Sequence, residues 1–278
     1  MAIIGIASSL LTSITNLALT SIPIQEARVA FDRMFEYSSL EKENNRGKVI
    51  AALQSIEMKN IDFRFNGRSR LLDDASISFE KGKVICLLGE SGNGKTTITE
   101  ILLKNYQPEK GNIVVNNSLF LDDINTENWR SFVSVVPQNI QLFNGNIIDN
   151  VVLDDTIDED KLKSLISLGF DRFINSLPQG FMTLVGEEGI NLSGGQKQLL
   201  GWMRALYHQP EFLILDEPTS SLDDSNRNFI YQLINLLKKD KIIFIISHHI
   251  EDINKIADQI FILKDKKITS YRTLQLYN

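Results

Sequence analysis

A glycine-rich loop about a third of the way along the chain constrains the fold more than any other feature. The loop consists of Gly89, Glu90, Ser91, Gly92, Asn93, Gly94, Lys95 and Thr96, and Thr97 follows it. It comes directly after the apolar run 84–88, which predicts a buried strand that leads into the loop. Glycines let backbone amides curl around phosphate oxygens, and a helix that begins near Gly94 directs its positive end at the same anion. The pattern therefore favours a phosphate-binding loop over an ordinary glycine turn.

Side chains suited to a triphosphate and a metal ion stand in this loop and after a second apolar run. Lys95 would neutralise the β and γ phosphates, and the Thr96 hydroxyl would hold Mg²⁺. The apolar run 212–215 is followed by Asp216 and Glu217, which stand at the strand end where open α/β sheets bind ligands. Asp216 would reach Mg²⁺ through water, and Glu217 would orient and deprotonate the attacking water. A strand that ends in solvated acids is the alternative, and the phosphate loop argues against it.

A third motif lies between the two, and we call it the serine-glycine turn. It consists of Leu192, Ser193, Gly194, Gly195 and Gln196, and it precedes a helical run to about residue 207. The Ser193 hydroxyl can cap that helix, and the glycines allow close backbone approach to an anion. Alone, such a pentapeptide is as consistent with a plain turn. With all three motifs in this order, residues from about 50 to about 271 resemble the nucleotide-binding domain of ATP-binding-cassette (ABC) transporters.

The resemblance implies an ATPase with ATP and Mg²⁺, in which the serine-glycine turn does not serve the nucleotide of its own chain. In the family the counterparts of Ser193, Gly194, Gly195 and Gln196 contact the γ-phosphate held by a second, facing domain. Two composite sites and a dimer follow, a homodimer being favoured and a heterodimer left open. Asp223 lies in a loop similar to the one through which the two cassettes sense each other.

Three further positions match the family one by one. Phe65 takes the place of the aromatic residue that stacks on adenine, although a strand core residue is an alternative and a stacked ring does not select adenine over guanine. Gln138 matches the glutamine that touches Mg²⁺ and the water, and alone would be a turn residue. His248, 31 residues after Glu217, matches the switch histidine at the γ-phosphate. His249 takes a position often held by arginine, and no role is predicted for it.

The apolar pattern predicts an α/β fold with a P-loop NTPase core. Short alternating runs at 61–65 and 75–79 favour an antiparallel β subdomain. Strands and helices then alternate, which predicts a mainly parallel sheet with helices on its faces. The expected strands are 83–88, 133–136, 212–215, 242–246 and 260–263, and a mainly helical insertion is expected between 147 and 177. We expect a helical unit at 1–37, a polar linker at 38–49 and the cassette at 50–278, with its helical subdomain at about 139–205.

The first 25 residues contain no charged side chain and many isoleucines and leucines. Their length suffices for a membrane span, and we expect the last transmembrane helix of an exporter here, continued as a cytoplasmic extension. Arg28 and Arg33 would place its C-terminal side in the cytoplasm. Serine, threonine and asparagine side chains between residues 8 and 20 suggest one face toward other helices or water. A soluble amphipathic arm is the alternative.

Charge and cysteine content narrow the class of function. A net charge of −6 and a pI near 5.2 provide no field that draws the chain to nucleic acid, so none is expected as a partner. The single cysteine, Cys86, lies in an apolar run and is expected to be a small buried hydrophobe. A soluble ABC ATPase acting on ribosomes or DNA, and a catalytically silent regulatory cassette, are the rival functions.

Three segments indicate the branch of the family. Residues 141–150 and 183–189 are similar to exporter segments, and in the second one Glu187 would contact the coupling helices of the membrane domain. Residues 24–36 are similar to the exit of the last membrane helix in bacterial peptide and bacteriocin exporters. We therefore expect ATP-driven export of a peptide-like substrate across the cytoplasmic membrane, with lipid or drug cargo as the alternative. An exporter half contains more membrane helices than this chain, so a fragment, a split half or a truncated sequence is expected, with the other helices as partners.

Overall fold

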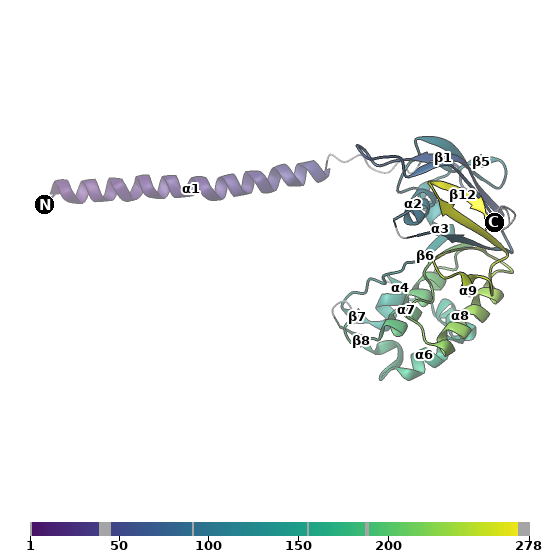
Figure 1. The fold of residues 1–278 in the computed structure, drawn as a ribbon. Helices are drawn as coiled ribbons and strands as arrows, with labels where there is room; N and C mark the ends of the chain where they lie inside the picture. The colour runs from purple at the N-terminus through teal and green to yellow at the C-terminus, as the bar shows by residue number, and fades with distance from the viewer. Residues whose placement is uncertain (1, 39–45, 91, 155, 187–188, 272–278) are drawn as a thin grey trace. The chain divides into compact units, whose positions relative to one another are not determined.

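A computed structural model describes residues 2–38, 46–90, 92–154, 156–186 and 189–271 of the chain. These residues form two compact units, one within residues 1–44 and one within residues 45–278 (Figure 1). Ser91 and Glu187, and most of the predicted linker, lie outside the described residues.

The first unit is a single long helix, α1 (Ala2–Ser38). Inside it, the hydroxyls of Thr15 and Thr20 donate to the carbonyls of Leu11 and Asn16, both at 2.5 Å, as such side chains do in helices. Within the described part of the chain, no helix combines the length and the mean hydropathy that a membrane crossing needs. The predicted membrane span is therefore not found, because polar side chains between residues 8 and 20 dilute the apolar ones.

The second unit contains a six-stranded, mainly parallel sheet in the order β12-β11-β3-β10-β9-β6. Its strands are β3 (Val84–Leu88), β6 (Val133–Val136), β9 (Phe212–Asp216), β10 (Ile242–Ser247), β11 (Gln259–Lys264) and β12 (Lys267–Ser270). Only β12 pairs antiparallel. The central strands are almost continuously buried and apolar, as expected where helices cover both faces of a sheet. The predicted parallel core is confirmed.

An antiparallel sheet in the order β2-β1-β4-β5 lies beside this core. Its strands are β1 (Ser55–Phe63), β2 (Leu72–Glu80), β4 (Lys110–Val115) and β5 (Leu119–Phe120). Alternation along β1 and β2 pairs buried residues such as Ile56 and Phe79 on the inner face. The predicted antiparallel subdomain is confirmed, and β1 ends two residues before Phe65.

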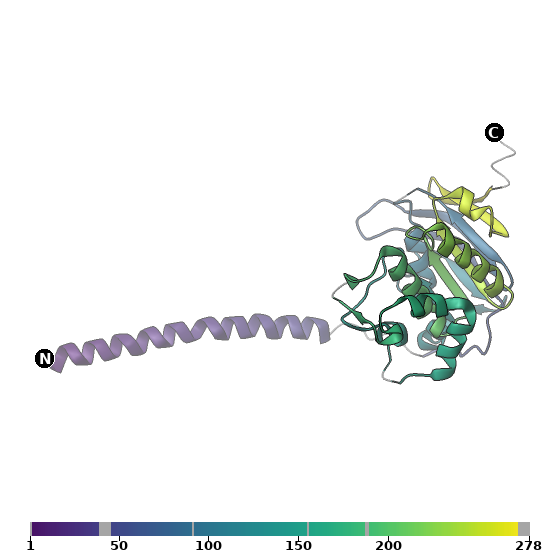
Figure 2. The same ribbon diagram turned by 90° about the horizontal axis from the view of Figure 1, so that it is seen from below.

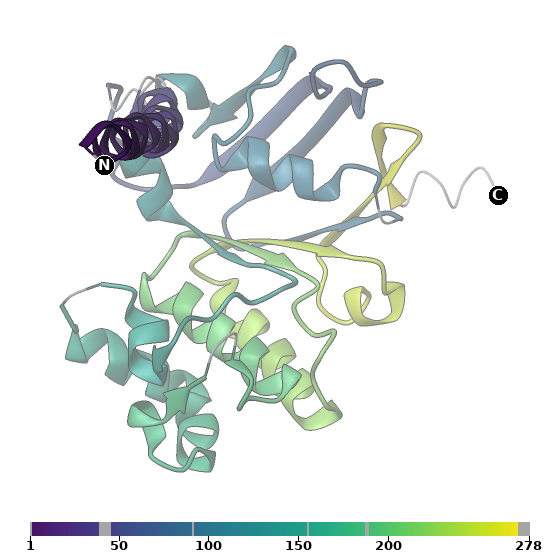
Figure 3. The same ribbon diagram turned by 90° about the vertical axis from the view of Figure 1, so that its left-hand side faces the viewer.

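The parallel sheet separates two apolar clusters, because successive side chains of a strand point to opposite faces. Ile85 and Leu87 pack with α2 (Lys95–Leu102), which lies between the two sheets (Figure 3). Val84, Cys86 and Leu88 belong to the cluster on the other face, together with residues of the helices α7 (Gly194–Tyr207) and α8 (Asp224–Leu237). Both helices lie on that side of the sheet (Figures 2 and 3). Burial raises the pKa of the Cys86 thiol far above its usual range, as expected for an inert buried cysteine.

The region between β6 and α7 contains the predicted helical insertion, since most of the described residues in 147–177 are helical. Its helices and short strands are β7 (Gly145–Asn146), α4 (Ile147–Val152), α5 (Glu159–Leu165), the π-helix η2 (Ile166–Phe170), α6 (Asp171–Ser176), the 3-10 helix η3 (Gly180–Met182) and β8 (Leu184–Val185). The remaining elements are the 3-10 helix η1 (Leu121–Asp123), α3 (Thr126–Phe132) and α9 (Ile250–Ile253).

Candidate functional site

A cleft of about 410 Å³ opens at the carboxyl ends of β3, β9 and β10. It is lined by Phe65, Arg68, Ser69, Leu71, Gly92, Gly94, Lys95, Thr96, Thr97, Gln138, Asp216, Glu217 and His248. Segments that are far apart in the sequence meet here because β3, β10 and β9 are parallel neighbours, so their carboxyl ends share one edge.

The phosphate loop brings the Lys95 ammonium to the floor of this cleft. Lys95 Nζ donates to the carbonyls of Gly89 and Glu90, at 2.6 and 2.9 Å, and α2 begins at Lys95. Gly94, at φ 99°, lies so close to Leu71 that a β carbon would stand 2.9 Å from Leu71 Cγ. The loop therefore needs glycine at this position, and it holds a cation and a helix N-terminus toward the cleft.

Asp216 and Glu217 follow one another at the end of β9. Burial, and then the charge of Glu217, raise the pKa of Asp216 above its usual value, while Lys95 opposes the rise. The Glu217 backbone is left-handed, with φ 50°, which costs a residue with a β carbon roughly 1 kcal/mol or more. Its amide donates to the carbonyl of Ile246 at 2.9 Å, so the neighbouring strand β10 holds this conformation.

The end of β10 also holds the Glu217 carboxylate. The His248 amide donates to Glu217 Oε1 at 2.9 Å, and His248 Nδ1 lies 2.5 Å from the same oxygen. The Ser247 hydroxyl donates to Oε2 at 3.2 Å. Glu217 is only 6% exposed, whereas the His248 side chain is 54% exposed. The buried carboxylate is thus fixed in orientation, while the imidazole lies at the cleft surface.

Phe65 stands in the loop between β1 and β2, with 37% of its surface exposed. Its ring makes edge contacts with Phe63 and Tyr106, with centroids 5.1 and 5.5 Å apart. These contacts orient an exposed aromatic ring at the mouth of the cleft. This geometry differs from the alternative of a buried strand residue.

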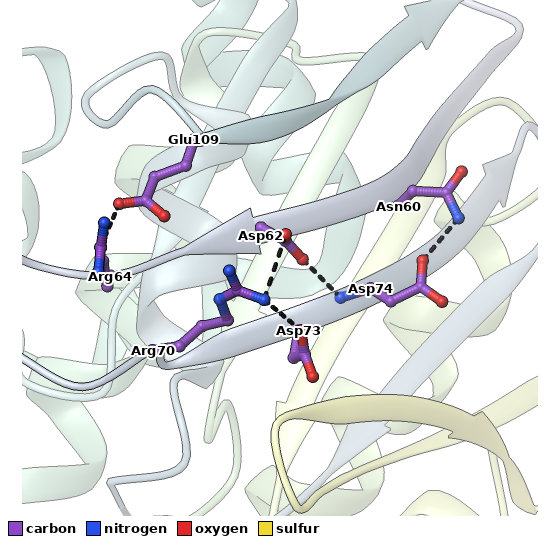
Figure 4. A network of polar contacts seen from close by, with 7 residues as sticks. All are labelled: Asn60, Asp62, Arg64, Arg70, Asp73, Asp74 and Glu109. Atoms are coloured by element: carbon purple, nitrogen blue, oxygen red, sulfur yellow. Dashed lines mark hydrogen bonds and ion pairs between the residues drawn. The ribbon is translucent and has the colours of Figure 1, made fainter.

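The strands β1 and β2 form a hairpin whose loop contains Phe65, and a polar network connects the two strands near that loop (Figure 4). The buried Asp62 accepts the Asp74 amide at 2.9 Å and lies 3.4 Å from Arg70, which also donates to Asp73 at 2.6 Å. The hydrogen bond from Arg70 lowers the pKa of Asp73. Sequence reasoning missed this network, and it also missed Arg68, Ser69 and Leu71 in the cleft lining and Ser247 behind Glu217. Ser247 stands beside the predicted His248, but only the pairing of β9 with β10 brings it to Glu217.

The serine-glycine turn lies in a different hollow, which shares no lining residue with the cleft. Ser193 is the N-cap of α7: its hydroxyl accepts the Gln196 amide at 3.2 Å, and Gln196 Oε1 accepts the Ser193 amide at 2.9 Å. The predicted cap is confirmed. A β carbon on Gly195 would stand 3.2 Å from the carbonyl of Ser221, so the turn packs closely on the loop after β9. Asp223 lines the same hollow and caps α8 by accepting the Asn226 amide.

The structure thus gathers Phe65, Lys95, Asp216, Glu217 and His248 in the cleft, with Gly92, Gly94, Thr96, Thr97 and Gln138. The carbonyls of Gly89 and Glu90 bind Lys95, and the Asn93 amide donates to Glu90 at 3.4 Å. The structure does not bring Ser193, Gly194, Gly195, Gln196 or Asp223 to this cleft.

Comparison with known proteins agrees with this geometry. The sequence profile of the family described as ABC transporter matches residues 72–220. An ATP-dependent lipid A-core flippase of Haemophilus influenzae is 34% identical over 264 residues, which cover 93% of this chain and 44% of that protein. ABC transporter B family member 29, chloroplastic, of Arabidopsis thaliana is 31% identical and covers 94% of this chain and 44% of its own length.

A solved structure of a bacterial Atm1-family ABC exporter with ATP bound superposes with a TM-score of 0.80 at 26% identity. It covers 92% of this chain and 46% of that one. The chain therefore spans less than half the length of these relatives. None of the relatives named here supports the predicted relation to peptide and bacteriocin exporters. The chain belongs to the ABC transporter family and contains a nucleotide-binding domain of the exporter type.

Proposed function

We propose that this chain is the ATP-hydrolysing cassette of an ABC exporter and that it works as a dimer. One observation carries the proposal. The cleft gathers a phosphate loop, a fixed carboxylate and a histidine, while the serine-glycine turn lies in a hollow of its own. The turn offers helix amides to an anion, but it does not line the cleft of its own chain. The nucleotide in the cleft of a second copy would provide that anion.

The cleft fits a nucleoside triphosphate. Lys95 is held by backbone carbonyls and lies beside the N-terminus of α2, so it provides positive charge for phosphate oxygens. Phe65 offers an oriented aromatic ring to a base at the cleft mouth. ATP is the substrate that the family implies, and phenylalanine stacking by itself does not discriminate adenine from guanine.

The residues proposed to hold Mg²⁺ fit that ion. Thr96, Gln138 and Asp216 line one cleft and offer only oxygen donors, apart from the glutamine amide nitrogen, and Mg²⁺ prefers oxygen. The pKa of Asp216 is raised by its partial burial and by the charge of the adjacent Glu217, and a nearby cation would stabilise the charged form of Asp216. When bound, the ion would neutralise the charge that develops on the phosphates.

Glu217 is proposed as the general base. Ser247 and the His248 amide fix its carboxylate, so a lone pair can be presented to a water molecule in one orientation. His248 would contact the γ-phosphate from the exposed side of the cleft. This preorganisation argues against a catalytically silent cassette.

We propose that the cargo is a lipid or similar amphipathic molecule. The flippases among the relatives support lipid cargo better than the peptide cargo expected from residues 24–36. In this proposal residues 50–278 form the cassette at the cytoplasmic side of the membrane, 1–37 a helical extension and 38–49 the linker. The cassette would act on membrane helices of a partner through Gln138 and Glu187.

The test is Mg²⁺-dependent phosphate release by the purified chain. Glu217→Gln should lower the rate by about 10²–10⁴-fold while ATP binding persists, because the amide cannot accept the proton. His208→Gln is the control, since His208 lies outside the cleft lining. Near-normal turnover in Glu217→Gln would remove Glu217 from this role.

A further inference from the structure

Three side chains with metal-binding atoms meet at the edge of the cleft: Glu217, His248 and His249. One ligand atom from each lies within 4.8 Å of the other two. The two imidazole rings lie 3.8 Å apart between centroids, and His248 Nδ1 lies 2.5 Å from Glu217 Oε1. The proposed hydrolysis uses Glu217 and His248 but leaves His249 without a role.

The cluster has one fixed ligand and two adjustable ones. The Glu217 carboxylate is buried and is held by the Ser247 hydroxyl and the His248 amide. The two imidazoles are exposed, so they can rotate without disturbing the core. A tetrahedral Zn²⁺ with bonds of about 2.0–2.2 Å needs ligand atoms roughly 3.4 Å apart. The ligand atoms lie within 4.8 Å of one another, so binding requires them to rearrange, and the two imidazoles that would move are exposed.

The donor set selects the kind of ion. Two imidazoles and one carboxylate, with a free position for water, are a ligand set of zinc and similar transition metals. Mg²⁺ prefers oxygen, which the proposed site at Thr96, Gln138 and Asp216 supplies. The two sets are adjacent in the cleft region but differ in chemistry, so a nitrogen-seeking ion would not need to compete for the oxygen site.

We propose that Glu217, His248 and His249 bind Zn²⁺ or a chemically similar divalent ion, and that this ion inhibits ATP hydrolysis. A carboxylate bound to the ion no longer offers its lone pair to water, and a bound His248 no longer faces a phosphate. The binding stands independently of the proposed function, whereas the inhibition rests on it.

The binding is tested on the full chain without nucleotide or Mg²⁺. Co²⁺ serves as a coloured probe, whose visible absorption reports nitrogen and oxygen coordination, and Zn²⁺ displaces it. We expect one ion per copy in the wild type. His249→Arg should weaken binding by at least about tenfold, since even the loss of a residue that only supports a metal ligand commonly costs that much.

His208→Arg is the matched control, because the chain has three histidines and His208 lies at the C-terminal end of α7, outside this cluster. It should leave the affinity unchanged. Equal affinity in the wild type and in His249→Arg would overturn the proposal, and so would an equal loss in His208→Arg.

The inhibition is tested as Mg²⁺-dependent hydrolysis at buffered free Zn²⁺. His249→Arg should keep basal activity and raise the half-inhibiting concentration of Zn²⁺ by about tenfold or more. Undiminished inhibition in His249→Arg would overturn the inhibitory part, since the ion would then act elsewhere. A wild type that binds Co²⁺ but hydrolyses no ATP would overturn the proposed function and leave the metal site standing.

Discussion

In the cleft, Glu217 has a left-handed backbone and Asp216 carries a pKa above its usual value. In the serine-glycine turn, Ser193 and Gln196 form a reciprocal capping box at the start of α7. In the cleft, the backbone of Glu217 and the charge of Asp216 both cost stability. In the turn, the capping hydrogen bonds between Ser193 and Gln196 stabilise α7. The cleft and the turn therefore lie in separate hollows of one copy, an arrangement that fits the proposed dimer with composite sites.

The strongest test of a composite site combines one defective variant of the cleft with one defective variant of the turn. Lys95→Ala removes the cation of the cleft. Gly194→Asp adds a negative charge to the turn, where a β carbon would meet Ser221 Cβ at an ordinary 3.4 Å. A carboxylate at a helix N-terminus also favours the helix, so the fold should persist. Each variant alone should lose ATPase activity by orders of magnitude.

An equimolar mixture of the two variants should regain activity. With random pairing in a symmetric dimer, about half of the dimers are mixed and each has one intact site, so roughly a quarter of the wild-type rate is expected. The measurement is phosphate release against mixing ratio. A mixture as inactive as its components would show that the turn serves the cleft of its own chain, or that one intact site is insufficient for turnover.

Nucleotide affinity tests whether the cleft binds ATP without help from the turn. Phe65→Ala should weaken binding of a fluorescent ATP analogue by about 1–3 kcal/mol, or roughly five- to 150-fold, because the stacking surface is lost. Phe65→Tyr keeps the ring and should bind normally. Gly194→Asp should also bind normally in dilute, monomeric protein. Weak binding by that variant would connect the two regions within one copy.

The stability of Ser193 variants tests whether the capping box of the turn stabilises α7. Ser193→Ala should lower the free energy of unfolding by about 0.5–2 kcal/mol, whereas Ser193→Gly should lower it by only about a few tenths. Urea unfolding followed by circular dichroism gives both values. Equal stability of the alanine variant and the wild type would mean that the capping box contributes nothing.

The smallest expected effect concerns Asp216 without metal or nucleotide. Its folded pKa lies above the usual 3.8, so ionisation costs stability at neutral pH, and that cost vanishes as the carboxyl becomes protonated in both states in acid. Asp216→Asn should therefore raise the urea midpoint at pH 7, and the gain should shrink toward pH 4.

Asp62→Asn is the matched control. Asp62 is buried, accepts the Asp74 amide and faces Arg70, so its replacement should lower the urea midpoint instead. A loss of stability in Asp216→Asn would contradict the view that the cleft holds its acids at a cost.

Much of the fold could be predicted from local pattern. Alternation at 61–65 and 75–79 and the apolar runs of β3, β9 and β10 identified both sheets, because burial on one or both faces leaves a direct periodicity. The N-terminal helix was predicted as a helix, but its polar side chains lower its mean hydropathy below that of a membrane span. A long segment without charged side chains is thus insufficient evidence for a membrane span. The similarity of residues 24–36 to peptide exporters was equally unspecific as evidence for the cargo.

The candidate site divides in the same way. The sequence by itself determined which residues have the chemistry of the cleft and of the turn, since the glycines, the capping serine and the acids after a strand answer local demands of backbone and charge. The tertiary structure alone decided that Ser247 holds Glu217, that Asp62 and Arg70 brace the hairpin of Phe65, and that His249 stands beside Glu217. These contacts depend on which strands pair and at what register, and no short stretch of sequence contains that information.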